Sequence, residues 1–404
     1  MRVLLCNDGS TPAGGAELSA LRLRTLLREA GHEVRLLSSD ASDRPGVPGA
    51  DVTCAGTTHP RLRVAAQTAN PAAAWVLRRE LATFRPDVVH LRMFLTQLSP
   101  LILPVLRHTP TLWQIVYYKA VCPRGTKLLP DGRRCTVRAG TVCLREGCVT
   151  PQSWALDMTQ QRLWRAWASD IDLAVTLSET MRRRLAENGM RGVGVLRNGV
   201  TERPARPPLS GPPTVGFAGR LVEEKGADLL VRAVARLRAV VPDVRLVIAG
   251  DGPQRPRLER LAADLGVADA TTFLGHLARD DVEHHLDAAW AQAVPGRWEE
   301  PGGNVTLEAM MRGTAVVASD LGGPAEVVEP GRTGLLAAPG SVASLAAALH
   351  ELLGDRARAE QLGAAGRDVA LERYTEPRVL DRVLRLYDEL LRRTTALPLE
   401  GHRP

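Results

Sequence analysis

The stretch WEEPGGNVTLEAMMRGTAVVASD, residues 298–320, decides how the chain folds. It reads as a Pro-Gly-Gly loop, then a short helix that Asn304 is expected to cap, then a buried strand over residues 315–318. Gly313 is expected to end the helix in the left-handed conformation. Glycines ahead of a helix start favour an anion site, because free backbone N–H groups and the positive end of the helix dipole face the ligand.

Two carboxylates bracket this helix start. Glu300 precedes it, and Glu308 lies about one turn inside the helix. A phosphate would meet the N–H groups, while the carboxylates would accept hydrogen bonds from sugar hydroxyls. The pattern suggests a sugar-nucleotide site, and an ordinary strand-to-helix loop with surface glutamates is the alternative.

Length and composition indicate a globular protein of two domains. The 404 residues exceed one ordinary core, and contents of 45% hydrophobic and 24% charged residues are typical of soluble proteins. No apolar segment follows a basic start, and no apolar run approaches the roughly eighteen residues of a membrane-spanning helix. We therefore expect a cytoplasmic protein without a signal peptide.

The formal charge of +7 comes almost entirely from arginine, since Lys119, Lys127 and Lys225 are the only lysines. The arginines are spread along the chain, and no basic run is interleaved with aromatic residues, which disfavours nucleic-acid binding. Weak attraction to an anionic membrane surface stays open. No feature of the sequence indicates an oligomeric state.

The chain begins with a βαβ pattern. A strand over residues 2–6, a Gly-rich loop, a helix over about 16–30 and a strand over 33–37 predict a parallel, doubly wound sheet. The Gly14-Gly15 pair lies where such sheets bind ligands, although the dinucleotide fingerprint GxGxxG is absent. A simple tight turn is the alternative.

His90 lies near the end of another expected strand, residues 87–91. A histidine at a strand end is a candidate sugar ligand or acid/base group. A histidine packed in the core is the alternative.

Residues 119–150 lack periodicity and hold four of the six cysteines: Cys122, Cys135, Cys143 and Cys148. Clustered thiols in a chain without a secretion signal favour a metal over disulfides, and four could close a tetrahedral zinc site. Because the spacings lack paired CxxC motifs, free thiols, disulfides and an iron–sulfur cluster remain alternatives.

Five prolines between residues 204 and 213 indicate a linker. We expect one domain over residues 1–203, a second over 214–375, and a final segment, 376–404, whose helix packs back towards the N-terminal domain. Two such βα domains would place a ligand in the cleft between them.

The second domain opens with a strand over residues 214–217, and the loop that follows carries Arg220 and Lys225. Both cations can bind one diphosphate from such a loop. Lys225 is the only lysine after position 127, so a flexible point charge is indicated there. The alternative is that Lys225 has no special role and is present by chance in a chain that otherwise uses arginine.

Several motifs together resemble the retaining glycosyltransferases of family 4, which have the GT-B fold. The loop from Gly219-Arg220 to Lys225-Gly226 resembles the family's GR…KG loop, and Glu300 to Glu308 matches its E-x7-E motif. The resemblance is specific in the second half and looser in the first. It is also carried by Asn198-Gly199-Val200, residues 248–253, residues 319–334, and Gly14-Gly15 with Glu17.

The resemblance implies two Rossmann-like domains facing a cleft, an acceptor-side N-terminal domain with a Cys-rich insertion at 119–150 and a C-terminal nucleotide-sugar domain. It also implies retaining transfer of a hexose-type sugar from a nucleoside-diphosphate sugar, with UDP preferred over GDP. The acceptor would be a hydroxyl of a natural product, a polysaccharide or a lipid-linked glycan. No catalytic metal or cofactor is expected, because cations bind the diphosphate.

The same resemblance implies roles for individual residues. Arg220 and Lys225 would stabilise the leaving diphosphate, Glu300 would face the donor sugar, and Glu308 would bind the ribose. The remaining donor-binding positions are Gly14, Gly15, Gly219, Gly250, Gly303, Asn304 and Val305, with His276 and Leu277 near the nucleobase. His90 would be the first histidine of the family's HxH strand end.

Two departures from the family pattern stand out. Val116-Tyr117 occupies the place of a His-Asp pair that many members carry, and Gly302 replaces an aromatic residue. The first departure motivates an alternative function, a catalytically silent nucleotide-sugar-binding protein. Neither departure affects the expected diphosphate site.

Overall fold

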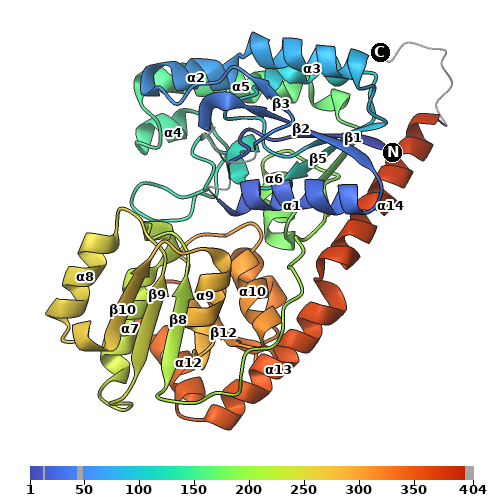
Figure 1. Cartoon of the computed structure of the whole chain (residues 1–404). Coiled ribbons are helices and arrows are strands. Elements are labelled where there is room, and N and C mark those ends of the chain that lie inside the picture. The colour runs from blue at the N-terminus through green and yellow to red at the C-terminus, as the bar shows by residue number, and fades with distance from the viewer. Residues whose placement is uncertain (12–13, 43–48, 396–404) are drawn as a thin grey trace. The chain divides into compact units, whose positions relative to one another are not determined.

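The structure is a computed structural model that describes residues 1–11, 14–42 and 49–395. The chain divides into two compact units (Figure 1). Unit 1 comprises Met1–Leu177, Met181–Arg197 and the chain from Val379, and unit 2 comprises Ser178–Thr180 and Asn198–Arg378.

Unit 1 is built on a seven-stranded parallel sheet in the order β3-β2-β1-β4-β5-β6-β7. The order reverses between β1 and β4, which makes their carboxyl ends the switch point of a doubly wound sheet. The strands are β1 Arg2–Cys6, β2 Glu33–Ser39, β3 Val52–Cys54, β4 Val88–Leu91, β5 Thr111–Ile115, β6 Leu173–Thr176 and β7 Gly194–Val195. The helices are α1 Gly15–Glu29, α2 Pro60–Thr68, α3 Pro71–Thr83, α4 Thr141–Arg145, α5 Pro151–Ala166, α6 Glu179–Glu187 and α14 Glu376–Thr395, with the first residues of α6 and α14 belonging to unit 2.

The long helix α14 completes the core of unit 1. Its residues Val383, Tyr387 and Leu390 are buried in one cluster with side chains of β1, β2, β4, β5 and β6. The sheet strands in this cluster are Val- and Leu-rich and nearly inaccessible, as expected for parallel strands covered on both faces.

Unit 2 has a six-stranded parallel sheet in the order β10-β9-β8-β11-β12-β13, with its switch point between β8 and β11. The strands are β8 Thr214–Ala218, β9 Arg245–Ala249, β10 Thr271–Gly275, β11 Ala291–Val294, β12 Ala315–Ser319 and β13 Gly334–Ala337. The helices are α7 Ala227–Leu237, α8 Arg255–Asp264, α9 Arg279–Leu286, α10 Asn304–Arg312, α11 Gly322–Val327, α12 Val342–Leu353 and α13 Arg356–Arg373.

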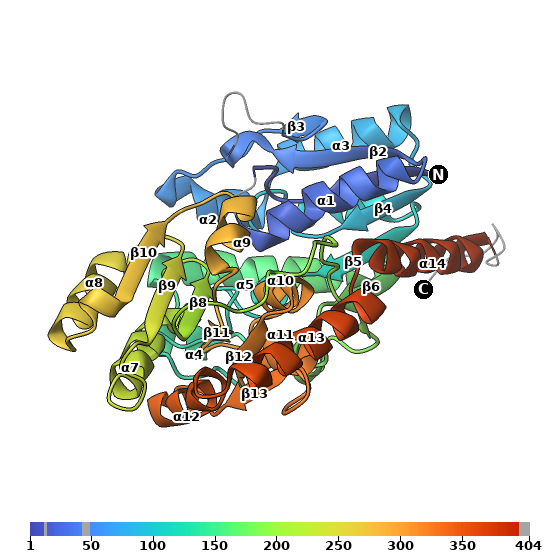
Figure 2. The same cartoon turned by 60° about the horizontal axis from the view of Figure 1, so that its bottom comes forward.

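The two faces of this sheet carry separate apolar clusters. In β12, Ala315 and Val317 join a cluster with α7, α8 and α12, whereas Val316 and Ala318 join one with α10 and α13. This alternation follows from the two-residue period of a strand. Figure 2 shows α7 and α12 beside each other, and the two helices pack in direct contact. The predicted pair of doubly wound parallel sheets is confirmed.

The proline-rich segment 204–213 belongs to unit 2 instead of standing apart as a linker. Leu209 is 4% exposed in the apolar cluster that also contains side chains of α7 and α12, and its N–H donates to Glu360 on α13 at 2.9 Å. The N–H of Arg206 donates to the carbonyl of Arg312 at 2.8 Å. The division between the compact units falls at Arg197–Asn198.

No helix in the part of the chain that the structure describes combines the length and apolar character needed to cross a membrane.

Candidate functional site

Two loops at the switch point of unit 2 pack closely against each other, backbone to backbone. One follows β8 and contains Arg220 and Lys225; the other follows β11 and contains Glu300. Gly226 has φ +70°, and a Cβ there would lie 2.1 Å from the carbonyl oxygen of Pro295. The N–H of Arg297 donates to the carbonyl of Glu224 at 2.8 Å. Only glycine allows the first loop to lie this close to the second.

This contact brings Lys225 and Glu300 together. The Lys225 Nζ atom lies 2.6 Å from Glu300 Oε2, with side-chain exposures of 19% and 16%. The same ammonium lies 5.9 Å from the centroid of the Trp298 ring. Two residues that are 75 positions apart, both predicted for the site, thus form a largely buried ion pair.

A second ion pair fixes the β11–α10 loop. Arg297 binds both carboxylate oxygens of Asp228, in the first turn of α7, at 2.5 and 2.7 Å. Burial by itself would raise the pKa of Asp228, but the hydrogen bonds from Arg297 outweigh it and lower the pKa. This pair could not be predicted from the sequence, because no local pattern connects residue 228 to residue 297.

Arg220 is exposed, directly after β8. Its guanidinium makes no hydrogen bond or ion pair with any residue that the structure describes. The carbonyl of Arg220 accepts from the N–H of Val222 at 3.0 Å, which shapes the turn. An exposed cation without an internal partner is available to an anionic ligand.

The start of α10 differs from the prediction in one detail. Gly303, not Asn304, is the N-cap, with φ +71° and no side-chain cap hydrogen bond. A Cβ at Gly303 would lie 2.9 Å from the backbone nitrogen of Pro324, so the chain turns where no other side chain fits. Asn304 is the first helical residue, and its Oδ1 atom accepts from Asn198 Nδ2 at 2.9 Å. The predicted Asn304 cap is therefore wrong.

The first N–H groups of α10 have no internal acceptor in the part of the chain that the structure describes. Among the described residues, no acceptor takes the N–H of Asn304 or Val305, whereas Thr306 already donates to the carbonyl of Gly303 at 3.0 Å. Free N–H groups at a helix start, together with the dipole, form an anion site. The predicted positions Gly303, Asn304 and Val305 are thus contiguous at one helix start.

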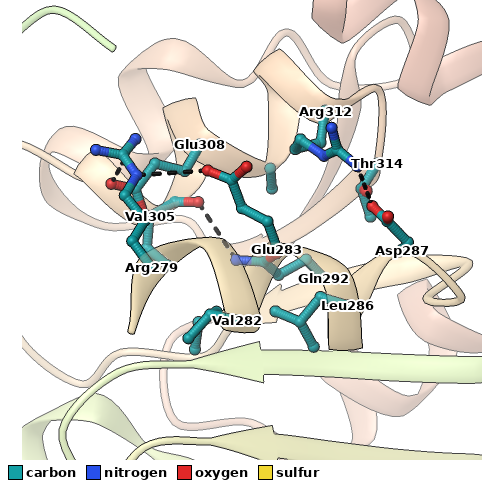
Figure 3. A pocket seen from close by; sticks show the side chains of 12 residues that line it. Arg279, Val282, Glu283, Leu286, Asp287, Gln292, Val305, Glu308, Arg312 and Thr314 are labelled. Carbon is teal, nitrogen blue, oxygen red and sulfur yellow. Dashed lines mark hydrogen bonds and ion pairs between the residues drawn. The ribbon is translucent and has the colours of Figure 1, made fainter. Parts of the chain in front are cut away.

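A pocket of about 40 Å³ lies between α9 and α10 and holds Glu308 (Figure 3). Arg279, at the start of α9, reaches Glu308 Oε1 at 3.3 Å and Glu283 Oε1 at 3.4 Å. Desolvation by the packed helices raises the pKa of Glu308, and the charge of Arg279 opposes this rise. The Glu308 side chain is 35% exposed, so a hydroxyl ligand can reach its carboxylate. Sequence reasoning missed Arg279, which carries no motif of its own.

Glycines also join the ends of β8, β9 and β10. The N–H of Gly219 donates to Ala249 at 3.0 Å, and the N–H of Gly250 donates to Gly275 at 2.8 Å. His276 and Leu277 follow directly, with His276 exposed and Leu277 half-buried. These predicted positions therefore lie along the same strand-end edge of unit 2 as the β8 loop.

The candidate positions in unit 1 lie in two different environments. Gly14 caps α1 and Gly15 begins it, so the glycine pair forms a helix start at the switch point of that sheet. His90 is inaccessible to solvent, with Nδ1 at 2.7 Å from the hydroxyl of Tyr387 on α14. Burial, and then the charge of Arg92, lower the pKa of His90 to about 3, so the ring is neutral at pH 7. This geometry is that of the alternative assignment, a histidine packed in the core.

Comparisons with known proteins agree with this architecture. Residues 13–203 match the model described as Glycosyltransferase Family 4, and residues 201–369 match the model described as Glycosyl transferases group 1. A glycogen synthase of Mycobacterium tuberculosis is 31% identical over 399 residues, covering 91% of this chain and 89% of that protein.

Other relatives match mainly a part of the chain. A GDP-mannose-dependent phosphatidylinositol monomannoside mannosyltransferase of the same organism is 43% identical over 162 residues, 39% of this chain and 42% of its own. A 2-deoxystreptamine glucosyltransferase of Streptomyces kanamyceticus is 35% identical over 184 residues, 46% of this chain and 47% of its own.

Solved structures share the fold over nearly the whole chain. Sucrose-phosphate synthase of Thermosynechococcus elongatus superposes with a TM-score of 0.73 at 22% identity, covering 97% of this chain and all of that one. HepE of Anabaena in complex with UDP gives 0.70 at 20% identity, covering 96% and 100%. The chain therefore belongs to the group 1, or family 4, glycosyltransferases, and it is a GT-B-fold glycosyltransferase that uses a nucleotide sugar donor.

Proposed function

We propose that the protein is a retaining, metal-independent transferase of a hexose-type sugar, acting in the cytoplasm on a hydroxyl acceptor. The observation that carries this proposal is the Lys225–Glu300 contact at 2.6 Å, in which Glu300 lies four residues ahead of the first residue of α10. A cation that binds phosphate and a carboxylate that binds sugar hydroxyls then lie next to each other, as the junction between sugar and diphosphate requires.

The proposed reaction breaks the bond between the anomeric carbon and the diphosphate oxygen. The acceptor oxygen bonds to the same carbon on the same face, and its proton passes to an oxygen of the leaving diphosphate. Lys225, Arg220 and the N–H groups of Asn304 and Val305 stabilise the charge that develops on that diphosphate. These cations supply the role that a divalent metal has in other transferases. The reaction needs no base from His90.

UDP is the proposed nucleotide of the donor. The HepE structures contain UDP and UDP-glucose, whereas the mycobacterial mannosyltransferase is GDP-mannose-dependent, so the two nucleotides must be compared directly. Thermal unfolding with UDP, GDP and ADP is the measurement, because a ligand that binds only the folded state stabilises it by about 2.7 kcal/mol at a hundred times its Kd. A larger shift with GDP than with UDP would reverse the assignment.

Turnover of the Lys225→Ala variant tests the site itself. We expect kcat to fall by about two orders of magnitude, the scale of losing one charge partner of the transition state. Arg232→Ala is the matched control, because it removes an exposed cation from α7, immediately beyond the same loop. Near-normal turnover of Lys225→Ala would reject the diphosphate site.

The stereochemistry and the acceptor are tested by product analysis. A retaining enzyme gives a product with the anomeric configuration of the donor sugar, which NMR of the isolated product reads directly. Assays should offer natural-product, polysaccharide and lipid-linked acceptors, with donor hydrolysis followed in parallel. Nucleotide binding without transfer or hydrolysis in every assay would favour the silent binding protein.

A further inference from the structure

Four cysteines outside the donor site surround one cavity. Cys122, Cys135, Cys143 and Cys148 all line a space of about 10 Å³ in unit 1. A space of this size is comparable to that of one small ion or one water molecule. The other two cysteines lie apart from it, Cys6 in β1 and Cys54 in β3, so the cavity gathers the four thiols of the segment 119–150.

Backbone turns bring these thiols together. The N–H of Cys122 donates to Tyr118 at 2.8 Å, and the N–H of Cys135 donates to Lys127 at 2.8 Å. The N–H of Cys148 donates to the carbonyl of Cys143 at 2.9 Å, just beyond the five-residue helix α4. The cysteines therefore come from three separate turns of a segment with little regular structure.

Lys127 supplies an independent observation. It lines the same cavity, its residue is 3% exposed, and its Nζ atom lies 2.6 Å from the carbonyl of Val137 and 3.9 Å from Cys135 Sγ. Within the described residues no carboxylate lies within 4 Å of this ammonium, whereas Lys119 pairs with Asp157 at 3.5 Å. A buried cation without a counter-charge is unfavourable, and thiolates at this cavity would provide one.

We propose that Cys122, Cys135, Cys143 and Cys148 bind one structural zinc ion as four thiolates, with Lys127 as the adjacent counter-charge. Four sulfur ligands favour tetrahedral zinc. Binding exchanges the four thiol protons for one Zn²⁺, releases the protons to solvent and transfers no electrons. The resulting site has charge −2, and the Lys127 ammonium compensates half of it.

Zinc would hold the segment in place. No group of three or more His, Cys, Asp or Glu side chains has metal-binding geometry anywhere in the described ranges, so the thiols must rotate towards the cavity on binding. Cys135 and Cys148 are partly exposed, which gives the ion a route in. Trp154 Nε1 donates to the carbonyl of Gly140 at 2.9 Å, so a metal-ordered loop would also be attached to α5.

The metal content of the wild-type chain is the primary test. Protein produced with zinc and purified under reducing conditions should contain about one zinc per chain. Exchange with cobalt should produce the visible bands of a tetrahedral site and thiolate-to-cobalt charge transfer. Absence of both, together with four thiols that react freely in the native protein, would overturn the proposal. So would two disulfides detected by intact mass.

Single variants assign the ligands. Cys143→Ser and Cys148→Ser should lose the metal and the cobalt spectrum, while the matched control Cys54→Ser should keep both. Lys127→Gln should weaken zinc binding roughly 10- to 100-fold in competition with a chelator, the scale of losing a neighbour of the ligands, and Lys127→Arg should restore it. Unchanged affinity in Lys127→Gln would remove Lys127 from the site.

Discussion

At the scale of single residues, most charges of the proposed donor site are held by an ion-pair partner. Lys225 is bound by Glu300, and Glu308 by Arg279. Such pairs place a cation or carboxylate in one position before the ligand arrives, which reduces the entropy lost on binding. Arg220 is the exception, because its guanidinium is exposed and makes no hydrogen bond or ion pair with the described residues.

Glu308→Gln should weaken donor binding more than turnover. A carboxylate that binds the ribose acts equally in the ground state and the transition state, so its loss raises KM and leaves kcat nearly unchanged. One hydrogen bond to a charged group contributes about 1.5–3 kcal/mol, which corresponds to roughly 10- to 100-fold in KM. Steady-state kinetics with varied donor measures this.

The matched control is Glu283→Gln, the neighbouring carboxylate on α9 that also contacts Arg279, at 3.4 Å. The KM of this variant for the donor should stay within about twofold of the wild-type value, because Glu283 has no proposed contact with the donor. A drop in kcat with unchanged KM in Glu308→Gln would place the carboxylate at the reacting sugar instead of the ribose.

His90 should make unit 1 sensitive to acid. Its pKa is lowered to about 3 in the folded protein, whereas the unfolded chain has the ordinary value near 6.5. The unfolded state therefore takes up a proton first as the pH falls. The stability due to the neutral ring is complete above about pH 6.5 and is lost progressively towards about pH 3.

Between pH 7.5 and 5 this loss should be roughly 2 kcal/mol, measured by urea unfolding followed by tryptophan fluorescence. The variant His90→Gln should lose this part of the pH dependence. His108→Gln should retain it, because His108 is exposed. Identical pH profiles for wild type and His90→Gln would show that another group is responsible.

At the scale of elements, the position of Lys225 depends on how two loops pack. Gly226→Ala would place a Cβ 2.1 Å from the carbonyl oxygen of Pro295, so the loops after β8 and β11 must separate. We expect kcat at saturating donor to fall at least tenfold, because small displacements of catalytic groups are costly. Gly266→Ala is the control: its φ is +67°, but nothing lies within 4 Å.

Both alanine variants share the strain of a left-handed backbone, about 1–2 kcal/mol of stability. Only the Gly226 variant disturbs a neighbouring loop. Equal kcat values in the two variants, with equal unfolding midpoints, would show that the loop contact does not position Lys225.

The sequence predicted the elements of unit 2 better than their contacts. Residues 214–218, 245–249 and 315–319 alternate with helical patterns, so a parallel sheet with its ligand site at the strand ends could be predicted. The Gly303 cap could not be predicted, because Asn304 has the stronger capping propensity. Only the close approach of Pro324, which the structure shows, favours glycine at position 303. The Lys225–Glu300 and Arg297–Asp228 pairs join residues far apart in the chain, and no local pattern records them.

At the scale of the whole molecule, the last helix determines the stability of the first unit. Leu390 is fully buried in the cluster that contains β1, β2 and β4. Leu390→Ala should lower the free energy of unfolding of unit 1 by about 2–5 kcal/mol, the usual cost of a truncated core leucine. Thermal unfolding monitored by circular dichroism should show an earlier transition for unit 1.

The control for this change is Arg385→Ala, an exposed position on the same helix. It should alter stability by no more than about 0.5 kcal/mol. UDP should still stabilise unit 2 in both variants, because its strand-end loops contain no residue of the buried face of α14. A Leu390→Ala variant as stable as wild type would mean that α14 does not hold the core of unit 1 in solution.

Segment 204–213 and α14 show why domain boundaries are hard to predict from composition. Five prolines resemble a free connector, yet Leu209 among them is buried in the apolar core of unit 2. Likewise, α14 follows unit 2 in the sequence but completes unit 1, because its apolar stripe packs on strands that lie far earlier in the chain, from β1 to β6. In both cases the unit to which the segment belongs is set by leucines, Leu209 and Leu390, that pack against elements far away in the sequence.

The place of α14 has a consequence for biosynthesis. A ribosome makes the strands of unit 1 before unit 2, but the side chains that cover them, Val383, Tyr387 and Leu390, are translated only after unit 2. During that interval the nascent chain exposes an apolar sheet surface, the kind of surface that chaperones recognise and that aggregates at high concentration. Unit 2 has its own complete core by Arg378, so the half translated second is the first that can fold fully.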